Sequence, residues 1–183
     1  MKKAIILHGT SETEQSFWFP YIKAELEKKG YSVSIPLLPD ADHPDLKNWL
    51  PVALKELYTE ETIIIGHSAG GPLILSVLEN LDVKVKQAIL VAGYARPKGS
   101  DPKPEPILQE NYNWEKIREN VEDCIFINSD NDPWGCNDIE GKYMLDKARK
   151  GKLIIMKGEG HMGSDTYHQP YKEFPFLIRL IVE

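Results

Sequence analysis

Six short apolar runs recur along the chain, separated by more polar segments. Most of them are nearly continuous in Ile, Leu and Val, which is typical of strands covered on both faces of a sheet. The runs lie at residues 3–8, 31–36, 62–67, 87–92, 123–128 and 152–157. The run at 31–36 instead alternates between apolar and polar positions, which indicates a strand nearer the edge of the sheet.

Segments with a helical period lie between these runs. In the first, apolar side chains recur every three or four residues from Trp18 to Leu26, and Gly30 follows as a stop signal. Further helices are predicted at 45–58, 69–80, 112–120, 137–149 and 172–182, with Pro51 ending or kinking the helix at 45–58. The repeated order of strand and helix favours right-handed crossovers. We therefore expect an α/β domain with a six-stranded, mostly parallel sheet and helices on both faces.

The segment 94–111 interrupts this alternation. It contains four prolines, charges of both signs and few apolar residues, so a long loop is predicted. Two interpretations remain open, a solvated surface excursion and a reduced lid over a binding site, because long loops at strand ends often carry function.

Composition narrows the class of protein. With 183 residues, 42% of them hydrophobic and 27% charged, one globular domain spanning 1–183 is expected. The net charge of −6 argues against nucleic-acid binding, which depends on clustered Lys and Arg.

Targeting signals are weak in this sequence. The apolar stretch from Ala4 to Leu7 is shorter than the roughly 7 to 15 residues of a signal peptide, and no run approaches membrane-spanning length. Cys124 and Cys136 form neither a C-x-x-C pair nor a disulfide framework. We expect two free thiols in a reducing compartment, and hence a cytoplasmic protein.

A serine between glycines is the first sign of chemistry. Residues 66–70 read Gly-His-Ser-Ala-Gly and match G-x-S-x-G, the nucleophile elbow of α/β-hydrolases. A predicted strand precedes the motif and a predicted helix follows it, with Pro72 suited to the first helical turn. Ser68 is therefore the candidate nucleophile, and the alternative is a surface serine in a glycine-rich turn.

Two backbone amides are candidates for an oxyanion hole. The N–H of Ala69, at the start of the helix, is the first. The second is the N–H of Thr10, with Ser11 as the alternative, because a His8-Gly9 pair at the end of the first strand resembles the oxyanion loop of α/β-hydrolases. His8 itself is predicted to anchor this loop through its ring nitrogens.

An acid and a base follow in the order that this fold uses, Ser, then Asp or Glu, then His. Asp130 and Asp132 lie at the end of the fifth strand, just past residue 128, and Asp132 is favoured because Pro133 holds it in an extended conformation. His161 lies between glycines after the sixth strand and is the predicted base, with His168 as its main rival.

Other histidines have weaker claims to the role of base. His43 lies in a predicted turn. His67 adjoins Ser68, but neighbouring side chains on a sharp turn diverge, so His67 is expected to support the turn from beneath.

The expected substrate is a small acyl compound, bound without metal or cofactor. Neither H-E-x-x-H nor paired-Cys spacing is present. Trp134, Trp18 and His67 are candidates for the wall of an acyl pocket, although Trp18 could equally pack in the core. Cys136 is treated as incidental.

Over essentially its whole length the sequence resembles the small serine hydrolases related to retinoblastoma-binding protein 9 and the bacterial YdeN-like proteins. The early His-Gly strand, the block from Trp18 to Leu50, and the GHSAG, NDP and GEGH segments carry the resemblance. It implies a minimal α/β-hydrolase without a large cap, active on small esters or related acyl compounds. The L-x-C-x-E motif associated with retinoblastoma-protein binding is absent, so that partner is not expected.

Several functions would fit these residues. An esterase is the leading interpretation, and a thioesterase, an amidase or an acyltransferase would use the same three side chains. A binding module that kept the fold and lost the chemistry is the alternative from another class.

Overall fold

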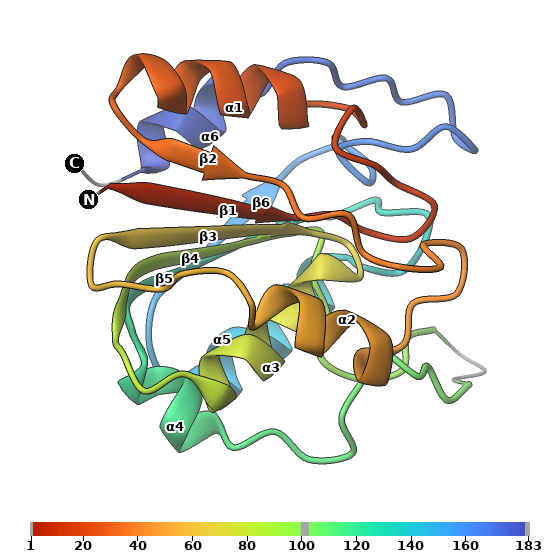
Figure 1. Ribbon diagram of the computed structural model, residues 1–183. Helices are drawn as coiled ribbons and strands as arrows, with labels where there is room; N and C mark the ends of the chain where they lie inside the picture. Colours follow the sequence, from red (N-terminus) through yellow and green to blue (C-terminus); the bar gives the residue numbers. More distant parts are fainter. Residues whose placement is uncertain (1, 100–102, 182–183) are drawn as a thin grey trace.

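Six parallel strands form the centre of the protein (Figure 1). The computed structural model describes residues 2–99 and 103–181. The strands are β1 (Lys3–Leu7), β2 (Ser32–Ser34), β3 (Thr62–His67), β4 (Val85–Val91), β5 (Val121–Ser129) and β6 (Lys152–Met156). They lie in the order β2-β1-β3-β4-β5-β6, and each neighbouring pair is parallel. The predicted sheet is confirmed, and these six strands are wholly parallel rather than mostly so.

The burial of the strands follows the sequence pattern. β3 lies inside the sheet and is buried along its whole length, as its continuous apolar run predicts. β2 lies at one edge and is only partly buried, which agrees with its alternating pattern. It is three residues long, shorter than the predicted 31–36.

Helices cover both faces of the sheet, as predicted. α1 (Phe19–Lys28) and α6 (Pro175–Leu180) lie together on one face, and the other four lie on the opposite face (Figure 1). These four are α2 (Leu46–Ala53), α3 (Gly70–Asn80), α4 (Trp114–Glu119) and α5 (Asp138–Ala148). No helix in the described part of the chain is long and apolar enough to cross a membrane.

Three helices are at least three residues shorter than the sequence predicts, and proline explains two of them. α2 ends at Ala53, two residues after Pro51, whose ring nitrogen has no hydrogen to donate. α6 begins at Pro175 rather than at 172, because the residue before a proline is disfavoured in helical conformation. In α4, the Asn113 side chain accepts a hydrogen bond from the Lys116 amide and so caps the helix later than expected.

The described residues of the predicted loop, 94–99 and 103–111, contain neither helix nor strand. The loop is tied to α2 by a hydrogen bond from the Leu46 N–H to the Pro106 carbonyl, 3.1 Å long. Residues 100–102 of the predicted loop lie outside the described part of the chain.

The strand order indicates a ligand-binding position at the carboxyl ends of β1 and β3. From β1 the chain runs outward to β2 and then returns to β3 on the other side of β1. In open parallel sheets, ligands bind beside the carboxyl ends of the strands at such a reversal. The loops after β1 and β3, which carry Thr10 and Ser68, meet at this point.

Candidate active site

Ser68 lies on a strained turn between β3 and α3. Its φ angle is +50°, in the left-handed region that residues with a Cβ rarely adopt. Its amide donates to the Val91 carbonyl on the neighbouring strand, 2.9 Å away, which fixes the turn to the sheet. The half-buried side chain opens into a cavity. This geometry is that of the predicted nucleophile elbow.

The glycines on either side of Ser68 are required by close backbone contacts. A Cβ on Gly66 would lie 2.7 Å from the carbonyl oxygen of Gly70, across the turn. A Cβ on Gly70 would overlap the carbonyl oxygen of Leu7 at the end of β1. The G-x-S-x-G pattern therefore reflects the packing of β1, β3 and α3 against one another.

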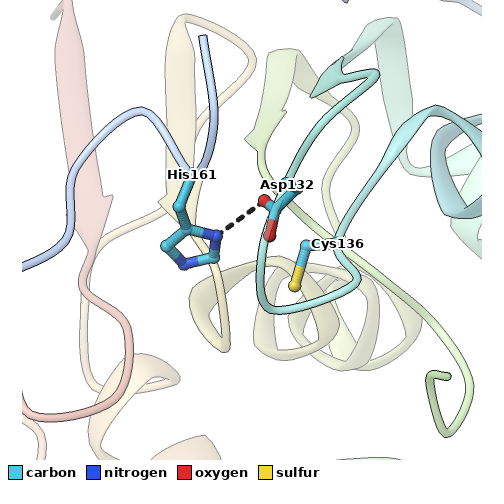
Figure 2. Close-up of side chains that lie close together, drawn as sticks. All are labelled: Asp132, Cys136 and His161. Atoms are coloured by element: carbon cyan, nitrogen blue, oxygen red, sulfur yellow. Dashed lines mark hydrogen bonds and ion pairs between the residues drawn. The ribbon is translucent and has the colours of Figure 1, made fainter. Parts of the chain in front are cut away.

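Asp132 and His161 are joined directly (Figure 2). Nδ1 of His161 lies 2.7 Å from Oδ2 of Asp132, and both side chains are buried. The other carboxylate oxygen accepts the N–H of Trp134 at 2.8 Å, which fixes the orientation of the acid. Because the carboxylate accepts the Nδ1 proton, Nε2 of His161 is left as the acceptor that a general base needs.

The buried position of His161 also sets its charge. Burial lowers the pKa of His161 below its usual value, although the hydrogen bond to Asp132 acts in the opposite direction. The imidazole is therefore neutral at pH 7 and able to accept a proton.

The backbone of His161 is fixed at both its amide and its carbonyl. The N–H donates to Oε1 of Gln169 at 2.8 Å, and the carbonyl accepts from Nε2 of His67 at 2.9 Å. Just before it, Gly160 has a φ of +59°, and its N–H donates to Oδ1 of Asn131 at 2.8 Å. A Cβ on Gly160 would overlap the Gln169 side chain, so the tight loop predicted around His161 needs this glycine.

The alternatives to Asp132 and His161 lie elsewhere. Oδ1 of Asp130 accepts the Gly158 amide at 2.8 Å, and Asp130 is exposed. His168 is exposed on its loop, and exposed His43 lies 3.2 Å from Oδ1 of Asp40.

The loop after β1 leaves one amide without a partner. The N–H of Ser11 donates to the Ala41 carbonyl at 2.8 Å, and the N–H of Gly9 donates to Oε2 of Glu12 at 2.5 Å. Among the described residues no partner is found for the amide of Thr10, which lines the cavity beside Ser68. Ser11 is therefore a poor alternative, because its amide is already bonded.

His8 anchors this loop as predicted. Its Nδ1 donates to the Gly9 carbonyl at 2.9 Å, and its Nε2 accepts the N–H of Leu38 at 3.0 Å. Burial lowers the pKa of His8, which agrees with a neutral ring that both donates and accepts.

Glu12 is a buried residue that was not among the predicted site residues, and its carboxylate bonds to His67. Oε1 of Glu12 lies 2.6 Å from Nδ1 of His67, and both side chains are almost fully buried. His67 thus supports the turn from beneath, as predicted, but through a partner 55 positions away in the sequence. A buried histidine needs hydrogen-bond partners. Because His67 ends an apolar run, the sequence could have indicated that its polar partner comes from another part of the chain.

A cavity of about 310 Å³ lies beside Ser68 and His161. Its walls include Thr10, Glu12, Phe17, Ser68, Tyr94, Lys98, Glu105, Trp134, Cys136, His161 and Ser164. Trp134 lines the cavity, as predicted, with its Nε1 3.4 Å from Oγ of Ser164.

Trp18 and His67 do not line this cavity, because both side chains point into the core. Trp18 is fully buried, donates from Nε1 to the Met162 carbonyl at 2.9 Å, and packs edge-on against the ring of His67. The bonds of His67 to Glu12 and to the His161 carbonyl hold its ring under the turn.

One group of side chains offers donors of the kinds that bind metals. Atoms of Asp132, Cys136 and His161 lie within 4.8 Å of one another (Figure 2). Asp132 and His161 are already bonded to each other, so a metal there would have to break that bond. Burial raises the pKa of the Cys136 thiol well above its ordinary value, so it stays protonated and weakly reactive. The geometry favours an acid–base pair at this position.

Comparison with known proteins identifies relatives of the whole chain. Residues 4–179 match the model of a family described as serine hydrolase. YdeN of Bacillus subtilis (strain 168) is 30% identical over 135 residues, which cover 72% of this chain and 71% of YdeN. Serine hydrolase RBBP9 of Rattus norvegicus is 27% identical over 186 aligned positions, which cover 98% of this chain and 93% of the relative.

Solved structures agree on the fold. The crystal structure of the ydeN gene product from B. subtilis superposes with a TM-score of 0.88, at 24% identity, covering 98% of this chain and 96% of that one. Est1E from Butyrivibrio proteoclasticus superposes with a TM-score of 0.69, at 14% identity, covering 100% of this chain and 89% of that one. The fold is that of an α/β-hydrolase, without a large cap over the described residues. The chain belongs to the serine hydrolase family.

Proposed function

We propose that this protein cleaves small carboxylic esters or related acyl compounds, with Ser68 as nucleophile, His161 as base and Asp132 as its acid partner. One observation carries the proposal. His161, whose Nδ1 lies 2.7 Å from Asp132, lines the same cavity into which the strained Ser68 opens. A serine, a neutral imidazole and an orienting carboxylate are the groups that acyl transfer requires.

In the first step, Ser68 Oγ attacks the acyl carbonyl while Nε2 of His161 takes the hydroxyl proton. In the described part of the chain, no hydrogen bond yet joins Ser68 to His161. Such bonds are often loose without substrate and tighten in the complex. Asp132 holds the imidazole by Nδ1 and stabilises the imidazolium that forms.

The negative charge on the carbonyl oxygen is stabilised by two amides, those of Ala69 and Thr10. Ala69 caps the N-terminus of α3, where amides lack partners within the helix. The unpartnered N–H of Thr10 supplies the second donor. One donor of this kind contributes about 3 kcal/mol to transition-state stabilisation.

The first tetrahedral intermediate then collapses. Its bond to the leaving group breaks, His161 gives its proton to that group, and the acyl group stays on Ser68 as an ester. A water molecule that loses its proton to His161 attacks this ester. His161 then returns that proton to Ser68 Oγ as the bond between Oγ and the acyl carbon breaks, and the acid product leaves.

The cavity limits the size of the substrate. Its volume of about 310 Å³ is at the lower end of the roughly 300 to 1,000 Å³ of ligand pockets. Its wall combines the rings of Phe17 and Trp134 with the polar groups of Thr10 and Ser164. A short acyl chain with a small polar leaving group fits this mixture.

We also propose that the loop at 94–111 acts as a reduced lid. Glu105 accepts from the hydroxyl of Tyr94 and pairs with Nζ of Lys98, each at 2.7 Å. The Lys98 ammonium lies 3.2 Å from the centre of the Tyr94 ring. All three side chains line the cavity, so this cluster closes one side of it.

Two broader expectations belong to this proposal. We take residues 1–183 as one catalytic domain that binds a small acyl substrate and no nucleic acid. A cytoplasmic location is supported by two free, buried cysteines, Cys124 and Cys136, which suit a reducing compartment.

Labelling with a fluorophosphonate probe tests the proposal. The folded protein should form a stoichiometric adduct, located at Ser68 by peptide mass spectrometry, and S68A should form none. Heat-unfolded protein is the control for nonspecific reaction. An unlabelled Ser68 in folded protein would refute the proposed function. A series of esters, thioesters and amides of increasing acyl length then identifies the preferred bond.

A further inference from the structure

The ring of His67 lies between two hydrogen-bond acceptors. Nδ1 is 2.6 Å from a carboxylate oxygen of Glu12, and Nε2 is 2.9 Å from the carbonyl oxygen of His161. A backbone carbonyl has no hydrogen to donate, so Nε2 must carry one. A carboxylate likewise only accepts, so Nδ1 must carry a second hydrogen as long as Glu12 is ionised.

The hydrogen bonds of Glu12 are those of an ionised carboxylate, whose oxygens only accept. Its other oxygen, Oε2, accepts the backbone N–H of Gly9 at 2.5 Å, so both oxygens face donors. A hydrogen bond from an amide stabilises the charged form of a carboxylate. A buried carboxylate without a cation would be costly, and the described residue that bonds to Oε1 is His67.

We propose that Glu12 and His67 form a permanent buried ion pair, in which the His67 imidazolium positions His161 for catalysis. The inference rests on the proposed role of His161 as the base. His67 acts through His161 and is a positioning residue rather than a catalytic one.

The pair joins three parts of the site that are distant in sequence. Glu12 belongs to the loop after β1, which also supplies the Thr10 amide, and His67 is the last residue of β3, directly before Ser68. His161 belongs to the loop after β6. The His67 imidazolium therefore bonds to the loop after β1 and to the loop after β6. These bonds fix Thr10, Ser68 and His161 relative to one another.

The charge of His67 also acts on His161. The centres of the two rings are 4.8 Å apart, so a positive charge on His67 opposes protonation of His161. Burial is the largest cause of the lowered pKa of His161, and the charge of His67 adds to it. For His67 itself, burial would lower the pKa, but the charge and hydrogen bond of Glu12 raise it above its usual value.

The groups around His67 fit this assignment. The charged or titratable groups that act on it are Glu12, Asp132 and His161. Three aromatic rings, those of Phe17, Trp18 and Phe19, also pack edge-on against it, with ring centres 5.8 to 6.2 Å away. The His67 side chain is fully buried, so its ring nitrogens are not exposed to bulk water.

Removing the charge of Glu12 should change the pKa of His161 in a predictable direction. In E12Q the side chain can donate to Nδ1, which leaves His67 neutral. His161 then loses a nearby positive charge and the more distant negative charge of Glu12, of which the first has the larger effect. Its pKa should therefore rise, by about 1 pH unit.

Nitrogen-15 NMR of histidine-labelled protein is the direct experiment, and it needs no substrate. In the wild type, both ring nitrogens of His67 should carry protons at pH 7 to 8, while His161 titrates below pH 6.5. In E12Q, one nitrogen of His67 should lose its proton and the titration of His161 should move up by about 1 pH unit. The exposed neighbour Glu14 provides the matched control, E14Q, which should match the wild type.

Kinetics supply the second readout. The acid limb of kcat/KM should move up with the titration of His161 in E12Q. E12D keeps the charge and should retain the wild-type limb even where kcat falls. A wild-type His67 with one protonated nitrogen at pH 7 overturns the ion pair, whatever the variants do. Unchanged titration of His161 in folded E12Q would reduce the pair to a structural role. Absence of labelling at Ser68 would instead refute the proposed hydrolase function and leave the NMR result intact.

Discussion

Nδ1 of His161 lies 2.7 Å from Asp132, while Asp130, two residues earlier in the same turn, is bonded to the Gly158 amide. The two carboxylates therefore have separate partners on the loop after β6. Asp130 holds the start of that loop, and Asp132 holds the imidazole at its far end.

Replacing each aspartate with asparagine should separate these roles. In D132N the imidazole loses the acceptor that fixes its tautomer, so kcat/KM should fall by about 10⁴-fold. D130N loses one charge on an exposed hydrogen bond and should change kcat/KM by less than about tenfold. Steady-state hydrolysis of a small chromogenic ester measures both. The reverse ranking would transfer the role of acid to Asp130.

The pH dependence of activity should reflect the buried position of His161. The base works when neutral, and burial lowers its pKa below the ordinary value of about 6.5. As pH falls, kcat/KM should therefore stay high past 6.5 and decline only at lower pH, with a slope of one proton. Measurements between pH 4.5 and 8 on protein shown to be folded by circular dichroism would reveal it. A midpoint above 6.5 would contradict this assignment.

Disrupting the cluster of Tyr94, Lys98 and Glu105 should change substrate selectivity more than the rate of the chemical step. E105A removes the acceptor shared by Tyr94 and Lys98, so the cavity wall should loosen. We expect the preference to move toward longer acyl chains, with kcat on the shortest ester changed by less than about threefold. The exposed Glu110 of the same loop gives the control, E110A. Equal profiles for the two variants would make the loop a surface excursion.

A methyl group at Gly70 should disrupt the approach of α3 to β1. In G70A the new Cβ meets the Leu7 carbonyl, so we expect a loss of about 3 kcal/mol in the free energy of unfolding, along with activity. At Gly30, with a φ of +82° and open space around it, alanine should cost only about 1 kcal/mol. Urea denaturation compares the two. A cost at Gly70 no larger than that at Gly30 would show that the close approach to Leu7 does not require glycine.

Local patterns predict the sheet and the positions of Ser68, Asp132 and His161 because each depends on its immediate neighbours. An apolar run marks a buried strand, and glycines mark the sharp turn around Ser68. Pro133 favours Asp132 over Asp130 as the acid because a proline restricts the backbone of the residue before it. Such signals are readable within a few residues, so they require no knowledge of the tertiary structure.

Features that depend on distant partners could not be predicted in this way. The bond between Glu12 and His67 joins residues 55 positions apart, and nothing near Glu12 distinguishes it from Glu14. The two tryptophans pose the same difficulty. Trp134 reaches the cavity and Trp18 turns into the core, which depends on the Met162 carbonyl that bonds the Trp18 indole.

The residues of the candidate site are synthesised at different times, because they follow different strands along the chain. Ser68 follows the third strand, whereas His161 follows the sixth and depends on it for its position. Under the proposed mechanism, a chain that has emerged only as far as β5 lacks the base that Ser68 needs. Hydrolysis would therefore begin only after β6 and the loop that follows it have joined the sheet.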